Sequence, residues 1–104
     1  MEDIVLKTLL FDFYGELLNE HQREIYEDAV FGDLSLAEIA EQEGTSRQAV
    51  QDILKRCENK LTEYENKLHL IERFELIKGK ADLIYKASGD ESIKKLALEI
   101  IEEM

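Results

Sequence analysis

The hydrophobic residues of this chain recur at helical spacing along almost its whole length. Near the N-terminus they fall three or four residues apart with acids between them, which predicts an amphipathic helix that ends near Leu18. Asn19 follows, and with Gln22 it has the spacing of a capping box, in which each side chain bonds to the backbone N–H of the other residue. This pair predicts that a second helix begins here and continues to about Val30.

A third and a fourth helix are predicted from signals of the same kind. Ser35 with Glu38 forms another capping box, which predicts a short helix that ends before Gly44. Either Thr45 or Ser46 has the side chain needed to cap the helix that comes next. The chain therefore starts with four helices joined by short turns.

The third and fourth helices have the spacing of a helix-turn-helix over residues 34–56. Ala40 lies four residues before Gly44, and a methyl-sized side chain suits the point where two steeply crossed helices touch. Gly44 suits the turn, because this turn usually needs a residue that tolerates a positive φ. The residues that close a small core between the two helices are then Ile39, Val50 and Ile53.

An apolar stripe continues along the fourth helix beyond the helix-turn-helix. Its positions alternate steps of four and three residues, as in the seam of a coiled coil: Val50, Leu54, Cys57, Leu61, Tyr64, Leu68 and Ile71. No glycine or proline interrupts the stripe before Gly79, so we expect one long helix over about residues 46–78. Such a helix is about 50 Å long at about 1.5 Å per residue, more than a globule of this size easily covers.

This length implies a partner for the stripe, either an antiparallel neighbour from the same chain or a second subunit. We expect a homodimer, because the first two helices already cover the N-terminal part of the stripe. The dimer seam is predicted at Leu61, Tyr64, Leu68 and Ile71. A C-terminal helical segment over residues 80–104 adds further apolar surface, and Ser88-Gly89-Asp90 predicts a turn before the last short helix.

The composition favours an all-α fold. The sequence has no proline and five glycines, and it is rich in residues with high helix propensity. At 104 residues, with no repeat and no linker, we predict a single helical domain over residues 1–104. One cysteine excludes an internal disulfide, no apolar run is long enough to span a bilayer, and the N-terminus does not resemble a signal peptide. We therefore expect a cytoplasmic protein with no membrane partner.

The net charge of -11 is unevenly distributed. Residues 1–45 carry twelve acids against two bases, whereas residues 46–104 carry twelve acids against eleven bases. Lys and Arg supply the sequence-independent attraction to phosphates, so the acidic first half weakens the case for nucleic-acid binding. The acidic first half is better suited to binding a basic partner.

The sequence runs at 19–25, 34–40 and 44–50 resemble the C-terminal promoter-reading region of bacterial sigma factors. More closely, the whole run through Tyr64-Glu-Asn-Lys-Leu68 resembles the YlxM family of small helix-turn-helix proteins. Members of that family are encoded beside the signal recognition particle GTPase and its receptor in many Gram-positive bacteria. The resemblance implies an all-α domain with a helix-turn-helix like sigma region 4, and a regulatory role in the signal recognition particle pathway.

Carried over to this sequence, the sigma-like pattern implies an exposed face on the second helix of the motif, the recognition helix. The residues implied there are Ser46, Arg47, Gln48, Gln51 and Lys55, and Arg56 adds a base beside them. Arg can bridge guanine O6 and N7, and Gln can bridge adenine N6 and N7. Of the two bases in the preceding helices, Lys7 and Arg23, Arg23 is the one available to bind phosphate, and the chain has none of the other sigma domains.

Two functions from different classes fit these features. The first is a regulatory protein that binds DNA or signal recognition particle RNA through the recognition helix. The second is a protein-interaction adaptor, which binds the signal recognition particle GTPase through the acidic N-terminal face and makes no direct contact with DNA.

Neither enzymatic chemistry nor a cofactor is predicted. Cys57 occupies a position of the apolar stripe, with no histidine near it in sequence to act as a base. His21 and His69 lack a second His or Cys at the spacing of metal ligands. The carboxylates that share one helical face are most simply a solvated or docking surface: Asp12, Glu16 and Glu20.

Overall fold

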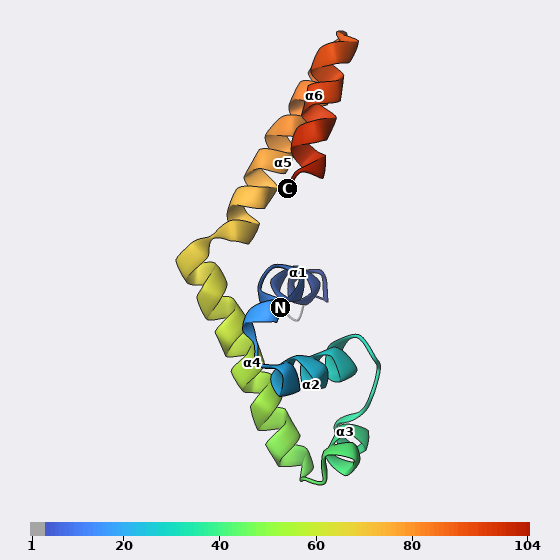
Figure 1. Cartoon of the computed structure of the whole chain (residues 1–104), viewed down its shortest axis with the longest axis vertical. Coiled ribbons are helices and arrows are strands. Elements are labelled where there is room, and N and C mark those ends of the chain that lie inside the picture. The colour runs from blue at the N-terminus through green and yellow to red at the C-terminus, as the bar shows by residue number, and fades with distance from the viewer. Residues whose placement is uncertain (1–3) are drawn as a thin grey trace. The chain divides into compact units, whose positions relative to one another are not determined.

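The computed structural model describes residues 4–104 and confirms the all-α fold (Figure 1). Over that range the elements are α1 (Ile4–Tyr14), the 3-10 turn η1 (Gly15–Leu17), α2 (Glu20–Val30), α3 (Leu36–Glu43), α4 (Arg47–Leu68), α5 (Leu70–Ala87) and α6 (Glu91–Glu102). Contacts between residues divide the chain into two compact units, residues 1–68 and residues 69–104. Whether the two fold together as the single predicted domain stays a prediction.

Both predicted capping boxes are formed. The backbone N–H of Gln22 donates to Asn19 Oδ1 at 2.8 Å, and the Gln22 side chain accepts from the backbone N–H of Asn19 at 3.3 Å. Ser35 Oγ accepts from the backbone N–H of Glu38 at 3.1 Å, and Glu38 Oε1 accepts from that of Ser35 at 3.0 Å. Hydrogen bonds from the backbone N–H and the side chain of Ser35 hold the pKa of the Glu38 carboxyl below its ordinary value. Local side-chain chemistry therefore fixes where α2 and α3 begin.

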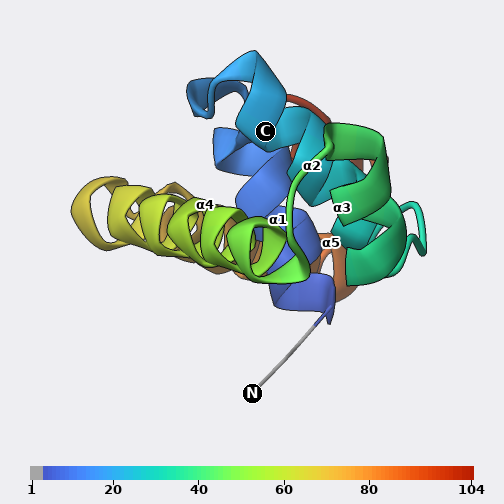
Figure 2. The ribbon, with the colours of Figure 1, turned by 90° about the horizontal axis from the view of Figure 1, so that it is seen from below.

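The helix-turn-helix is built as the spacing predicts. α3 ends at Gly44, which has left-handed backbone angles of φ 66° and ψ 35°. The buried side chains between the helices belong to Ile25, Ile39, Ala40 and Val50, with Ile53 packed against them. α1, α2 and α3 all lie along one side of α4, so the first half of α4 is covered on that side (Figures 1 and 2).

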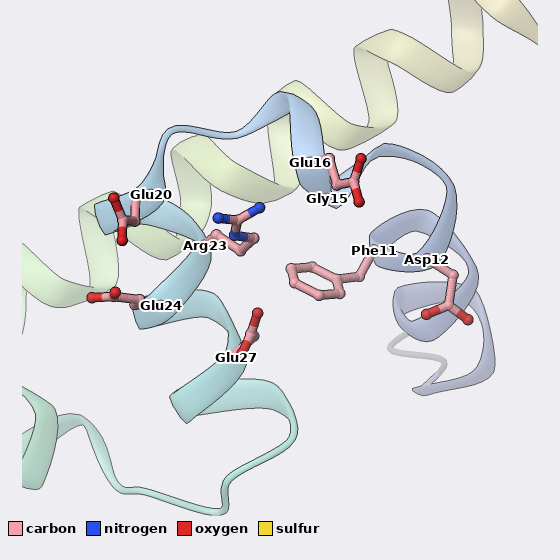
Figure 3. Close-up of a pocket in the computed structure, with 8 residues that line it drawn as sticks. All are labelled: Phe11, Asp12, Gly15, Glu16, Glu20, Arg23, Glu24 and Glu27. Carbon is pink, nitrogen blue, oxygen red and sulfur yellow. The ribbon is translucent and has the colours of Figure 1, made fainter.

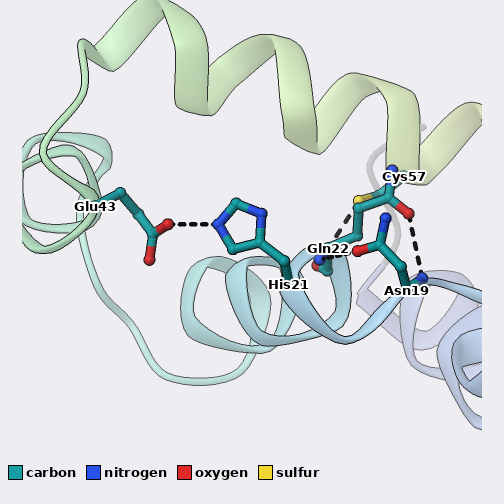
Figure 4. Close-up of polar contacts among 5 residues, drawn as sticks. All are labelled: Asn19, His21, Gln22, Glu43 and Cys57. Atoms are coloured by element: carbon teal, nitrogen blue, oxygen red, sulfur yellow. Dashed lines mark hydrogen bonds and ion pairs between the residues drawn. The ribbon is translucent and has the colours of Figure 1, made fainter.

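The apolar stripe of α4 is covered from within the first unit. Cys57 and Leu61 are fully buried, and the Cys57 thiol lies 3.8 Å from the backbone carbonyl oxygen of Gln22 (Figure 4). The ring of Tyr14 in α1 lies 6.0 Å from the ring of Tyr64 and is tilted by 30° to it, and the Tyr14 hydroxyl donates to Glu65 Oε1 at 2.5 Å.

The residues of the predicted dimer seam differ in their exposure within one chain, and the seam stays a prediction. Leu61 and Ile71 are buried inside one chain and Tyr64 is half-buried, whereas Leu68 stays exposed.

The helix expected over residues 46–78 is not continuous, and this prediction is wrong. α4 ends at Leu68, and His69 has left-handed backbone angles of φ 56° and ψ 30° before α5 begins. Histidine is among the non-glycine residues enriched in this conformation, and the His69 ring lies 3.1 Å from a Glu72 carboxylate oxygen. Leu68 and Ile71 keep their three-residue spacing across the break, so periodicity alone gives no sign of it.

The second unit is a hairpin of two antiparallel helices, α5 and α6 (Figure 1). The predicted turn at residues 88–90 is present, and Asp90 caps α6 by accepting from the backbone N–H of Ser92 at 2.8 Å. The side chains that become buried in this unit are few: Ile71, Ala81 and Ala97.

Replacing Gly44 tests the turn directly. A Cβ at this position meets no atom within 4 Å, so the cost of a side chain comes from the positive φ alone. We expect Gly44→Val to lower the free energy of unfolding by about 2 kcal/mol, since a β-branched residue is strained there. Gly44→Asn is the matched control, because asparagine tolerates this conformation and should cost much less. Chemical denaturation followed by circular dichroism measures both, and equal stabilities would contradict the role of the turn.

Candidate nucleic-acid interface

The recognition helix starts at a defined cap. Ser46 Oγ accepts from the backbone N–H of Ala49 at 3.1 Å, so Ser46 rather than Thr45 caps α4. The predicted contact residues are all exposed, at the cap or along the first part of α4: Ser46, Arg47, Gln48, Gln51, Lys55 and Arg56.

Arg47, Gln51 and Lys55 are each four residues apart and therefore form one line along the helix surface. Gln48 stands beside that line, and its Nε2 donates to Asp52 Oδ1 at 3.0 Å. The amide of Gln48 is thus held in place by a carboxylate of the same helix. Arg56 borders the line on the side of Asp52.

Four of these six residues line a concave surface of about 700 Å³ at the start of α4. Ser46, Arg47, Gln48 and Gln51 line it from α4, together with residues 35–37 from the start of α3. Lys55 and Arg56 lie further along α4, outside it. Sequence reasoning missed residues 35–37 as site residues, although the Ser35 capping box marks a helix start.

The ends of two helices therefore meet at one surface. The first backbone N–H groups of a helix have no partner within the helix, and the helix dipole places positive charge at that end. Such ends bind phosphates and other anions. α3 and α4 both begin here with Arg47 beside them, and the Glu38 carboxylate of the capping box is the acid at the start of α3.

A second concave surface, the acidic surface, lies between α1 and α2 (Figure 3). It has a volume of about 510 Å³, and Arg23 stands among its carboxylates. Those carboxylates belong to the predicted Asp12, Glu16 and Glu20, joined by Glu24 and Glu27. The two additional residues follow Glu20 at helical spacing, which is the signal that could have found them.

The histidines are engaged with carboxylates. His21 Nε2 lies 2.5 Å from Glu43 Oε1 and so joins α2 to the end of α3 (Figure 4). His69 Nδ1 lies 3.1 Å from Glu72 Oε2. Within residues 4–104, no group of three His, Cys, Asp or Glu side chains is placed to hold a metal ion. In the same range no helix is both long and apolar enough to cross a membrane.

Comparison with known proteins covers both units. A family model described as "Putative helix-turn-helix protein, YlxM / p13 like" matches residues 1–103. The chain is 45% identical over 108 residues to a UPF0122 protein of Thermoanaerobacter pseudethanolicus, covering 99% of this chain and 91% of that protein. It is 46% identical over 100 residues to a UPF0122 protein of Clostridium kluyveri, covering 92% and 90%. A UPF0122 protein of Malacoplasma penetrans is 42% identical over 97 residues.

The Cys57 thiol should react slowly in the folded protein. Burial raises the pKa of Cys57, so the reactive thiolate is scarce as well as inaccessible. We expect alkylation at neutral pH to follow unfolding, with native protein labelled at least about a hundredfold more slowly than protein in denaturant. Mass spectrometry of timed samples measures both rates, and rapid labelling of the native chain would contradict the buried position.

Proposed function

This chain belongs to the UPF0122 family of YlxM/p13-like helix-turn-helix proteins, and we propose that it is a regulatory protein that binds nucleic acid through α4. The target in this proposal is DNA or signal recognition particle RNA, and the role is regulation of the signal recognition particle pathway. We propose no catalytic step and no cofactor.

The observation that carries this proposal is the shared surface at the starts of α3 and α4. A phosphate seated there would receive backbone N–H groups from a helix end and the Arg47 guanidinium at the same time. The contact fixes the position of the protein on a duplex without reading sequence. Beyond it, the line of Arg47, Gln51 and Lys55 would face the groove.

The net charge of residues 1–68 determines how strongly nucleic-acid binding would depend on salt. Residues 1–68 carry sixteen acids and seven bases, a net charge of -9. Most of this negative charge repels nucleic acid, so the few bases of α4 must supply the whole electrostatic attraction. Binding should therefore be weak at physiological salt and fall steeply as salt increases.

A second candidate function is favoured by the acidic surface. Five carboxylates around a single arginine form a concavity that suits a basic protein segment. In this alternative the chain is an adaptor that binds the signal recognition particle GTPase through the acidic surface, without direct DNA binding. The two functions use different faces, so variants separate them.

The proposal also includes a cytoplasmic location and a homodimer. A two-fold dimer would present two recognition helices to one nucleic acid, which raises affinity without new contacts at each site. We propose the cytoplasmic location because we propose a role in the signal recognition particle pathway.

The first functional prediction concerns the bases of α4. We expect Arg47→Ala with Lys55→Ala to abolish the gel shift of genomic DNA fragments and of signal recognition particle RNA, because these two residues supply much of the attraction. Where residual binding can be measured, the slope of log K against log salt should fall by about 1.8.

The matched control removes the same charge elsewhere. Lys86→Ala with Lys95→Ala takes two exposed bases from α5 and α6, and this variant should bind much as the wild type does. Binding that survives the change in α4, or that shows no dependence on salt, would exclude α4 as the contact surface.

The second functional prediction concerns the acidic surface. If the adaptor function holds, Glu24→Lys with Glu27→Lys should reduce capture of the purified signal recognition particle GTPase by at least about tenfold, because it reverses two charges in the concavity. Glu91→Lys with Glu102→Lys makes the same change of net charge on α6 and should leave capture intact. Equal loss in both variants would point to net charge rather than to this surface.

A further inference from the structure

A further concave surface, the aromatic groove, lies between α1 and α2 beside the acidic surface. Its volume is about 580 Å³, and it shares Phe11, Asp12 and Glu27 with the acidic surface. The other residues that line the aromatic groove are Thr8, Asp28, Phe31 and Gly32. The groove therefore adds a second phenylalanine ring, which neither proposed function uses.

Packing holds the Phe11 ring in place. This ring points from α1 toward α2 (Figure 3). It stacks on the ring of the fully buried Tyr26, with the centroids 5.6 Å apart and an angle of 12° between the planes. Gly15 leaves room for the ring, because a Cβ at that position would lie 3.0 Å from it. The aromatic side of the groove is consequently formed before any partner binds.

Phe31 presents an exposed ring in the same groove. It follows the last residue of α2, and its ring centroid lies 5.4 Å from that of Phe11, with the planes tilted by 60°. Phe31 is 43% exposed. Binding sites combine such apolar rings in a concave surface with a few polar groups that fix the orientation of the ligand. The face of an aromatic ring carries partial negative charge, so it also attracts cations.

The charge around the two rings identifies the kind of occupant. Asp12, Glu27 and Asp28 line the aromatic groove, and no base among residues 4–104 does so. Arg23 lines the acidic surface instead, and Lys7 of α1 is paired at 3.3 Å with an acid of α4. Three carboxylates beside two ring faces attract a cation and repel the phosphates of a nucleic acid. Charge complementarity therefore selects a basic protein segment.

Arginine fits the aromatic groove better than lysine does. A guanidinium is planar, so it stacks on an aromatic ring, and it can donate two N–H groups to one carboxylate. The ammonium group of lysine is a strongly hydrated point charge that does not stack in this way. The exposed Phe31 ring and the carboxylates of Glu27 and Asp28 supply partners for both kinds of guanidinium contact.

We propose that the aromatic groove binds a basic segment of a partner protein, and that an arginine of this segment stacks on Phe31 among Asp12, Glu27 and Asp28. The inference rests on the adaptor function proposed above and specifies the chemistry of the segment that the adaptor binds. The rest of the segment would continue along the acidic surface, which adjoins the groove at Phe11. No residue of α4 takes part.

Two labelled peptides of equal charge test the arginine contact. One is a short synthetic peptide of alternating arginine and alanine, and the other has lysine in place of every arginine. Fluorescence anisotropy should show that the full chain binds the arginine peptide about fivefold more tightly, since long-range attraction is the same for both peptides. Equal affinities, or no binding of either peptide, would overturn the proposal.

Phe31→Leu removes the aromatic face and keeps an apolar side chain. The preference for arginine should fall close to equality, while the affinity for the lysine peptide changes by less than about twofold. Tyr85→Leu is the matched control, because Tyr85 is 37% exposed and lies on α5. This control should keep the preference, and circular dichroism checks that both variants are folded. A preference that survives Phe31→Leu would contradict the proposed contact.

Neutralising two carboxylates of the groove provides a second, independent variant. Glu27→Gln with Asp28→Asn should weaken the binding of both peptides about fivefold, because both are attracted by charge. Glu91→Gln with Glu102→Gln makes the same change of net charge on α6 and should leave both affinities unchanged. Equal weakening in the two variants would contradict binding in the aromatic groove.

The same measurements distinguish this proposal from the proposed functions. Arg47→Ala with Lys55→Ala should bind both peptides as the wild type does, and neither peptide contains any part of the signal recognition particle GTPase. Nucleic-acid binding and capture of the GTPase can therefore fail while the arginine preference stands. A second copy of the chain is the other occupant to exclude. Light scattering that gives a dimer for the wild type and a monomer for Phe31→Leu would assign the groove to that copy and overturn the proposal.

Discussion

The burial of one face of α4 is the interaction on which the N-terminal unit depends. Val50, Cys57 and Leu61 are fully buried along that face, and α1, α2 and α3 all pack against it. Since the three preceding helices lie on one side of α4, the rest of its surface stays exposed and carries the bases and amides of the recognition surface. The same packing brings the start of α3 to the start of α4. Core and candidate site are therefore two faces of one helix.

Local chemistry explains why so much of this unit could be predicted. Asn19 with Gln22 and Ser35 with Glu38 satisfy backbone donors within four residues of chain, so they act wherever the helices are placed. Gly44 is similar, because a positive φ is a property of one residue. The break at His69 had no such signal. The apolar spacing continues through the break. The left-handed backbone conformation of His69 depends on its contacts in the folded chain, which the sequence pattern does not show.

The candidate site was predicted in part for the same reason. The residues of α4 follow from a motif with fixed spacing, whereas residues 35–37 join the site only because α3 crosses α4. Glu24 and Glu27 likewise belong to the acidic surface through the packing of α1 on the same side of the unit. The acidic surface and the basic residues of α4 favour different kinds of partner. An acidic surface suits a basic protein and a basic line suits phosphates, so the account of function depends on which face is used.

Backbone amide shifts decide between those faces most directly. Two-dimensional NMR spectra of ¹⁵N-labelled protein, recorded during titration with signal recognition particle RNA or a DNA duplex, report every amide at once. Our account predicts that the largest changes fall at residues 35–37 and 46–51, where the two helices begin. Changes confined to residues 12–27, or no changes at all at low salt, would contradict it.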